Sequence, residues 1–457
     1  MMTRNEEKSH QIFGIRIGYT TKKLTPYGGF VLIAKYFEKI ELRSALKGMM
    51  PFEYTSPNRI KPEDKLIGFM AVLLAGASRF SHMMHLGNAD VLRDMFGLER
   101  VSLVGSTITR FFNKITHMGQ TNELAEKCWN YLKTLINWQE LESDWLSFDS
   151  TVITRYGEQE GAKKGYNPSK KGRASHHPLL AFLNKSRIVL TLWNRSGDVS
   201  SASHINSFFE GAYARIKGLI RVEGVLADSG FYLDSFINLL EAKTLKYVIT
   251  AKLYSTLQRK IYAVKNWAQI EPGLLISEFR FKQDKWKNKR RYIVVRQSIN
   301  KRKKTLGRQL KLFEFETESY RYGVWVTNMV EPPLTVWRTI RCRSNDENTI
   351  KELKEDLALS GFALTAFYPT EAAMLIRCFL YNLLLIFKTQ FLPKNEQTSR
   401  ISTLRFTYFI IPAHLGRNAH FDCLRLSVFS AKVRSKIQFV LDAIDSFSKP
   451  PAQLHCV

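Results

Sequence analysis

The chain has 457 residues, of which 45% are hydrophobic and 24% are charged, values typical of globular proteins. This length allows about three folding units of ~150 residues and excludes a mini-protein that depends on disulfide bonds. The charge is unbalanced, because 68 Lys and Arg face 41 Asp and Glu and leave a net charge of +27. Such an excess favours a polyanionic partner, above all a nucleic acid.

Residues 1–10 lack the apolar core of a secretory signal peptide, so we expect a protein that is not exported. Two stretches, Leu66–Ala77 and Ala372–Phe387, are strongly apolar. The first is too short to cross a bilayer and the second is interrupted by Arg377 and Asn382, so we expect two core helices and no membrane span. The five cysteines show no Cys-x-x-Cys spacing, which argues against a zinc site or a disulfide framework.

Apolar residues recur at helical spacing from about Lys61 to Ile136 and predict a helical region. We expect Ser106 to cap a helix that continues to Ile115, after a break around residues 97–105. Two short helices separated by a break are typical of a DNA-reading helix-turn-helix. An ordinary helical bundle gives the same pattern, so both interpretations stay open.

Short β-prone runs begin at Trp145 and alternate with a helical pattern at Ser203–Ile220, which predicts an α/β layer. The runs are Trp145–Thr154, Ile188–Trp193, Val222–Ala227 and Tyr247–Thr250. After Lys252, four further runs follow one another without a helical pattern and predict a β-rich segment: Leu275–Phe281, Tyr292–Arg296, Leu310–Phe315 and Tyr322–Thr327. Helical spacing returns at Arg343 and continues through Pro369–Gln390 and Phe429–Phe447.

About half of the net charge lies in residues 280–311, where 14 Lys or Arg face one acid. The densest run surrounds an indole between two predicted strands: Lys285, Trp286, Lys287, Lys289, Arg290 and Arg291. A hairpin tip of this kind offers cations to phosphates and an aromatic face to an unstacked base, although a solvated basic loop is the alternative. A second basic group, again either a DNA-tracking segment or a flexible loop, comprises Lys163, Lys164, Lys170, Lys171 and Arg173.

Two acids end predicted strands. Asp149 closes an apolar run, a costly place for a carboxylate unless it caps a turn, binds a cation or takes part in chemistry. Asp228 closes a second run and precedes Ser229 and Gly230, a sequence that alone most often forms a turn. Two acids at the ends of neighbouring strands can share a hard divalent cation.

A third acid, Glu347, lies on one predicted helix stripe with Arg343, Lys351 and Lys354. On its own this residue is ambiguous, because a surface Glu paired with Lys351 is very common. Its neighbour Glu352 lies too far around the helix to share the stripe.

These acids lie in three strings, Phe148–Val152, Ala227–Tyr232 and Asp346–Lys354, that resemble the acidic motifs of DDE transposases from bacterial insertion sequences. Arg343, Glu347 and Lys354 have the spacing of the Arg-Glu-Lys part of that family's Tyr-Arg-Glu-Lys signature. The position of the signature's Tyr holds Ile340, so the phosphate or base contact made by that Tyr is not expected here.

The resemblance implies an α/β protein with a ribonuclease H-like mixed-sheet core, interrupted by a β-rich insertion and flanked by helical regions. The 119 residues between Asp228 and Glu347 are too many for one connection and leave room for that insertion. The predicted organisation is a helical N-terminal region for DNA binding or dimerisation (1–140), a first core part (141–251), the basic insertion (252–330), a second core part (331–392) and a helical C-terminal region (393–457).

The resemblance also implies that Asp149, Asp228 and Glu347 hold two Mg²⁺ ions, or Mn²⁺ in their place, and act in cleavage and transfer of element ends. Arg343, Lys351 and Lys354 would contact DNA phosphates. The implied partners are double-stranded DNA, as element ends and target, and a second copy of the chain; no membrane and no organic cofactor are expected, and the site of action would be the bacterial cytoplasm at the nucleoid. A nuclease that cuts without joining, and an inactive DNA-binding protein, are the alternatives.

Overall fold

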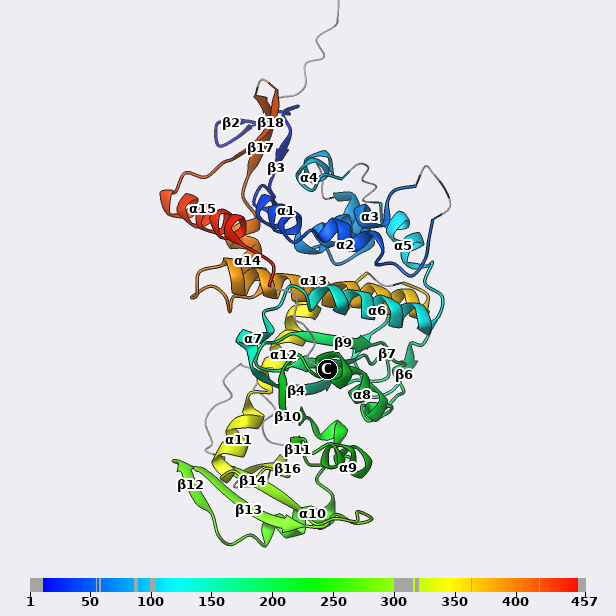
Figure 1. Ribbon diagram of the computed structural model, residues 1–457, viewed down its shortest axis with the longest axis vertical. Helices are drawn as coiled ribbons and strands as arrows, with labels where there is room; N and C mark the ends of the chain where they lie inside the picture. The colour runs from blue at the N-terminus through cyan, green and yellow to red at the C-terminus, as the bar shows by residue number, and fades with distance from the viewer. Residues whose placement is uncertain are drawn as a thin grey trace, which may run out of the picture.

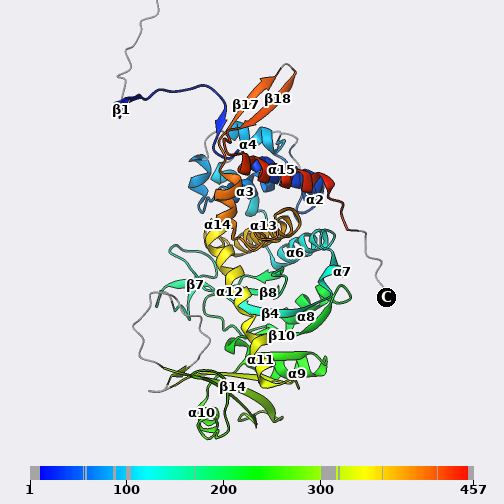
Figure 2. The same ribbon diagram turned by 90° about the vertical axis from the view of Figure 1, so that its left-hand side faces the viewer.

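The computed structural model describes residues 11–54, 56, 59–85, 89–98, 104–168, 170–299, 315–316, 320–362, 364–418 and 420–450. The basic run 301–304 and nearly all of the predicted strand Leu310–Phe315 lie outside these residues. The molecule is elongated, with helices from both ends of the chain in an upper tier, a sheet below them and further strands at the lower end (Figures 1 and 2).

A ten-stranded mixed sheet is the centre of the fold. The strand order is β12-β13-β14-β16-β11-β10-β4-β8-β9, with β15 paired to β16. β4 lies parallel to β10, and β10 parallel to β11, whereas β8 and β9 continue antiparallel on the other side of β4. The strands are β4 (Ser143–Ser150), β8 (Leu179–Leu183), β9 (Val189–Trp193), β10 (Arg221–Ala227), β11 (Lys246–Thr250), β12 (Ala268–Glu271), β13 (Leu274–Phe281), β14 (Arg290–Ser298), β15 (Phe315–Glu316) and β16 (Tyr320–Thr327).

The sequence predicted most of these strands, and three elements differ from the expectation, the first being the short β12, which lies before the first predicted run of its segment. β8 was not predicted, because its five residues are all apolar and all buried, so the run carries no alternation. The segment after Lys252 also contains a helix, α10 (Ser255–Tyr262), whose eight residues bury only Leu257 and Ile261.

The strands of the basic segment extend the central sheet. β16 pairs antiparallel with β11 through the register Val248↔Thr327, and β14 pairs with β16 along eight residues. The β-rich segment therefore adds four strands and the short β15 to one edge of the same sheet. It does not form a separate layer (Figure 1).

The helices of the structure flank this sheet or form the upper tier. Near the sheet lie α8 (Ile205–Ile216), α9 (Asp234–Ala242), α11 (Pro333–Arg341) and α12 (Ser344–Lys351), the last followed by a π-helical turn, η3 (Glu352–Asp356). The upper tier contains α1 (Phe30–Lys39), α2 (Leu42–Lys47), α3 (Pro62–Leu74), η1 (Phe80–His85), α4 (Ala89–Met95), α5 (Gly105–Phe112), α14 (Ile401–Leu404), the π-helical η4 (Arg405–Phe409) and α15 (Ala431–Ser446). Between sheet and upper tier run α6 (Met118–Leu132), with the short α7 (Trp138–Leu141) after it, and α13 (Phe367–Phe391).

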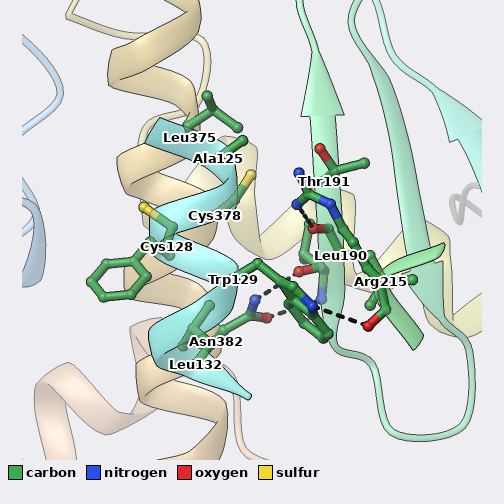
Figure 3. A pocket seen from close by; sticks show the side chains of 12 residues that line it. Ala125, Cys128, Trp129, Leu132, Leu190, Thr191, Arg215, Leu375, Cys378 and Asn382 are labelled. Carbon is green, nitrogen blue, oxygen red and sulfur yellow. Dashed lines mark hydrogen bonds between the residues drawn. The ribbon is translucent and has the colours of Figure 1, made fainter. Parts of the chain in front are cut away.

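α13 is the core helix that joins the two tiers. Its Asn382 accepts a hydrogen bond from Val189 N at 2.9 Å and donates one to Val189 O at 2.7 Å, so a polar side chain docks the helix on β9. Trp129 of α6 donates to Arg215 O at 3.1 Å, and Figure 3 shows these side chains around the packed interface. Burial raises the pKa of the Cys128 and Cys378 thiols there to about 12.

Of the helices that the structure describes, only α13 is long and apolar enough to cross a membrane by length and composition. Its most apolar stretch is entirely buried inside the protein, as predicted for a core helix.

Two predictions about the terminal regions are wrong. α5 begins at Gly105 with Val104 as its N-cap, and Ser106 lies inside the first turn, where its carbonyl accepts from Arg110 Nε at 3.3 Å. The C-terminal region is not all helical, because the hairpin β17 (Ala413–Asn418) and β18 (Phe421–Leu426) pairs with β3 (Leu24–Thr25) from the other end of the chain. The remaining strands form small sheets: β1 (Gln11–Ile12) with β2 (Ile15–Arg16), and β5 (Ile153–Thr154) with β7 (Ala174–His176) and β6 (Lys163–Lys164).

Glu371 gives the fold a pH-dependent stability. Burial raises its pKa from 4.5 to about 7, although bonds from Thr121 and the Asn194 amide, at 3.1 Å, oppose the rise. Because the folded state holds this proton more tightly than the unfolded state, stability falls as the pH rises from about 4.5 to about 7, by on the order of 3 kcal/mol. We expect Glu371→Gln to lose most of this dependence and to be the more stable protein at pH 8, as urea denaturation midpoints at pH 5 and 8 would measure. Equal midpoint changes in both proteins would contradict the assignment.

Candidate active site

Two neighbouring parallel strands place the first two acids at one edge of the sheet. Phe148 of β4 lies opposite Ala227 of β10, so the next residue on each strand is an acid, Asp149 or Asp228. Because parallel strands end at the same edge, their carboxyl ends meet there. Asp149 is buried, whereas the side chain of Asp228 is one-third exposed.

Each of these carboxylates uses one oxygen locally. Asp149 Oδ1 accepts from its neighbour Ser150 N at 2.7 Å, and Asp228 Oδ1 accepts from Gly230 N at 2.8 Å, which caps the short 3₁₀ turn η2 (Ser229–Phe231). Gly230 is required in this turn, because a Cβ there would lie 2.8 Å from Ser201 Cβ. The turn expected from Asp-Ser-Gly is therefore present, and the second oxygen of each acid remains for another partner.

The second oxygens converge on one cation. Arg343, the N-cap of α12, places Nη2 2.9 Å from Asp149 Oδ2 and 3.9 Å from Asp228 Oδ2. Burial lowers the pKa of Arg343, but attraction from Asp149, Asp228, Asp346 and Glu347 outweighs burial and raises it. Burial likewise raises the pKa of Asp149 well above its ordinary value, against the opposing effect of Arg343. Among the described residues, the buried guanidinium Nε has no hydrogen-bond partner.

Sequence reasoning missed a fourth acid beside this cation. Asp346 is buried and accepts from Ser147 Oγ and, at 2.9 Å, from Asn184 Nδ2. Ser147 lies two residues before Asp149 on β4, so both face the same side of the sheet. The signal was available in the sequence, because Asp346 directly precedes Glu347 and shares its helix.

The structure does not assemble the predicted cluster of three acids. Glu347 is exposed on α12, and nowhere in the described part of the chain do three His, Cys, Asp or Glu side chains converge as metal ligands. What converges is a pair, Asp149 and Asp228, with Arg343 between them. Two carboxylates repel each other unless a cation lies between them, and here the Arg343 guanidinium occupies that place. Such a carboxylate pair is also able to hold a divalent metal ion.

The two lysines of the predicted helix stripe lie in different environments. Lys354 lies in the π-helical η3 and donates to Thr151 Oγ1 at 3.1 Å and Val152 O at 3.0 Å, directly after the strand that carries Asp149. Lys351 is exposed on the last turn of α12. Thus Arg343 and Lys354 come to the acidic edge, while Lys351 faces solvent.

The two adjacent histidines are structural. His176 and His177 are both buried. His176 accepts from Arg155 Nε at 3.1 Å, and burial, with Arg155, lowers its pKa to about 4. His177 bonds to Ser150 Oγ and Val199 O, both at 3.1 Å.

The basic hairpin tip lies next to the Asp228 turn. Trp286 packs against Tyr232 with ring centroids 4.6 Å apart, and the guanidinium of Arg290 lies 5.0 Å from the Trp286 ring. Tyr232 also bonds to Tyr292 of β14 through the two hydroxyls at 2.6 Å. The indole is thus engaged by the protein itself.

The cations of the tip fall into two groups. Arg290 is buried and pairs with Asp234 at 2.7 Å and Glu241 at 2.8 Å, and Arg291 bonds to Glu278 and two backbone carbonyls, so these two have internal partners. Lys285, Lys287 and Lys289 are exposed. The second basic group is exposed as well, on and beside the β5-β7-β6 ribbon that follows Asp149: Lys163, Lys164, Lys170, Lys171 and Arg173.

A family model described as transposase DDE domain group 1 matches residues 10–446. The chain belongs to this family. It is therefore a transposase, an enzyme of DNA transposition, and transposase DDE domains use divalent metal ions.

A solved structure titled "Cryo-EM structure of piggyBac transposase synaptic complex with hairpin DNA (SNHP)" is similar to this transposase, with 11% identity, 94% of this chain and 87% of that chain covered, and a TM-score of 0.41. No curated protein matches this chain in sequence.

Proposed function

We propose that this transposase binds the ends of a mobile DNA element, hydrolyses a phosphodiester bond at each end and joins the freed 3′-hydroxyl groups to target DNA. The observation that carries the proposal is the convergence of Asp149 Oδ2 and Asp228 Oδ2 on one cationic nitrogen at the end of two parallel strands. In the first step, water bonds to phosphorus and the bond to the element's 3′ oxygen breaks. In the second, that 3′-hydroxyl attacks a target phosphodiester and displaces a target 3′ oxygen.

We propose a ribonuclease H-like core, as found in the bacterial insertion-sequence enzymes of the Tyr-Arg-Glu-Lys group. The order β9-β8-β4-β10-β11 supports it, with three antiparallel strands followed by two parallel ones and the acids on β4 and directly after β10. The chain departs from the group's signature at Ile340, which is buried on α11.

Asp149, Asp228 and Glu347 are the proposed ligands of two Mg²⁺ ions, with Mn²⁺ as a substitute. When bound, such ions polarise the phosphodiester and activate the attacking oxygen. The chain's own residues orient the site: Ser150 N and Gly230 N fix the outer oxygens of two carboxylates, and Arg343 screens them from each other. With a metal held by Asp149 and Asp228, the guanidinium of Arg343 would be free to neutralise a DNA phosphate.

The proposed DNA contacts are exposed cations together with Arg343 and Lys354, the two partly buried cations that reach the acidic edge. They are Lys285, Lys287 and Lys289 at the hairpin tip, the β5-β7-β6 ribbon, and Arg343, Lys351 and Lys354 of the α12 segment. The tip also borders a groove of about 630 Å³ lined in part by Arg280 and Lys289. Because Arg290, Arg291 and Trp286 already have partners in the protein, we propose that they hold the tip in place. We further propose a homodimer on DNA, acting in the bacterial cytoplasm at the nucleoid.

A joining assay tests this function. We expect the wild-type protein, mixed with labelled element-end DNA, supercoiled plasmid and MgCl₂, to yield labelled DNA covalently attached to the plasmid. Cut end DNA without attachment would instead identify a nuclease that does not join strands. Tight binding without any cut product, in MnCl₂ as well as MgCl₂, would identify an inactive DNA-binding protein.

A further inference from the structure

A cluster of cations surrounds one tyrosine in the upper tier, far along the chain from the acids. Lys65 Nζ lies 4.3 Å from the centroid of the Tyr54 ring, and Lys114 Nζ lies 4.8 Å from it. The Arg59 guanidinium lies 6.0 Å from the same ring and donates to Tyr54 O at 2.8 Å. Arg110 of α5 lies close enough for its charge to act on Lys65, and we call Arg59, Lys65, Arg110 and Lys114 together with Tyr54 the Tyr54 patch.

Aromatic packing fixes the Tyr54 patch. Phe52 lies between Tyr54 and Phe111, with ring centroids 5.6 Å apart in each pair. Phe111 belongs to α5 and Lys65 to α3, so the rings tie the loop before α3 to both helices, which lie in the upper tier (Figure 1). The cations are therefore held by a packed base and do not hang from a loose loop.

No ion pair neutralises the cations of the Tyr54 patch within the described residues. Burial lowers the pKa of Lys65, and the charges of Lys114 and Arg110 lower it further. Like charges placed this close repel and cost stability in the free protein. Such a cluster is stabilised when an anion is bound among the cations.

We infer that the Tyr54 patch is a binding site for the phosphates of duplex DNA. This inference rests on the proposed function for the identity of its ligand. The exposed Arg59, Arg110 and Lys114 surround the half-buried Lys65, so several phosphates of one backbone can be met together. The Tyr54 hydroxyl accepts from Lys65 Nζ at 2.8 Å, which leaves its own proton for a phosphate oxygen. The patch includes α5, the second of the two short helices that resembled a DNA-reading pair in the sequence.

Salt-dependent binding tests the patch without any catalysis. In EDTA, fluorescence anisotropy with a labelled random-sequence duplex measures affinity from 50 to 300 mM NaCl. For Lys65→Gln with Lys114→Gln we expect roughly tenfold weaker binding per lost contact near 100 mM salt, and a salt slope reduced by about 0.9 for each. The Lys→Arg pair should keep most of the affinity. Lys127→Gln is the matched control, because Lys127 is partly exposed and already paired with Glu123 at 2.6 Å on α6.

The two possible failures are distinguishable. An unchanged affinity and slope in the double Gln variant, with an unchanged circular dichroism spectrum, would overturn the patch even if the wild type joins DNA. If the double Gln variant loses DNA affinity while the wild type neither cuts nor joins DNA, the patch is supported and the proposed function is overturned. Retained DNA affinity together with lost binding to vesicles containing anionic lipid would assign the patch to membranes and overturn it as well.

Discussion

Asp149→Asn should abolish both cutting and joining of end DNA while leaving DNA binding intact or slightly stronger. The substitution keeps the shape of the side chain and the bond from Ser150 N, but it removes the charge that a divalent ion and Arg343 both need. We expect a loss of roughly a thousandfold or more in joining rate, equivalent to about 4 kcal/mol of transition-state stabilisation. Asp228→Asn should behave in the same way.

Metal binding itself gives a second readout. Mn²⁺ should raise the unfolding temperature of the wild type, since a ligand that binds only the folded state stabilises it, and the rise should be lost in both Asp→Asn variants. Glu123→Gln is the matched control, because it removes the charge of an exposed carboxylate of α6 that pairs only with Lys127 in the described residues. Full joining by Asp149→Asn would contradict the site.

The same assay decides which acid of α12 takes part. Asp346 has two side-chain donors and is buried, whereas Glu347 is exposed beside Arg343. We therefore expect Glu347→Gln to lose joining and Asp346→Asn chiefly to lose stability. Full joining by Glu347→Gln, with loss of joining by a folded Asp346→Asn, would move the third ligand to Asp346.

Glu352→Gln should be the most destabilising single change near the site. Glu352 is buried in η3 and pairs with Arg187 at 2.6 Å and with the buried Lys388 at 3.5 Å, and it accepts from Ile401 N at 3.3 Å. Removing its charge leaves two cations confined together, a change that costs about 3–5 kcal/mol. The triad joins η3 to the turn before β9, to α13 and to α14. Its loss should therefore also displace Lys354 from its position beside Asp149.

Glu355→Gln is the matched control for that change. It lies three residues further on, pairs with Arg400 at 3.0 Å and is exposed, so its loss should cost under about 1 kcal/mol. Urea denaturation midpoints of the two variants measure the difference. Equal shifts would contradict a special role for the buried triad.

The sequence predicted the parts of the site that depend on short stretches of chain. β4 and β10 were recognisable because each apolar run ends at an acid, and α12 was recognisable from its spacing. The contact of Arg343 with both acids was not predictable, since it joins residues 194 and 115 positions apart. The contact of Trp286 with Tyr232 was also not predictable, because Tyr232 lies 54 positions earlier in the chain. The indole was expected to be free for a base, but Tyr232 and the nearby Arg290 both engage it.

The continuity of the central sheet has a mechanical consequence. Since β11 hydrogen-bonds to β10 on one side and to β16 on the other, backbone bonds run without interruption from the strand that bears Asp149 to the strands that present the hairpin lysines. Movement of the hairpin lysines on a bound DNA backbone would be transmitted to the carboxylates through the hydrogen-bonded strands, because no hinge separates the two. The basic insertion therefore cannot be removed as an independent unit. Deleting it would leave β11 without its partner β16 and would expose an unpaired, aggregation-prone strand edge beside the active site.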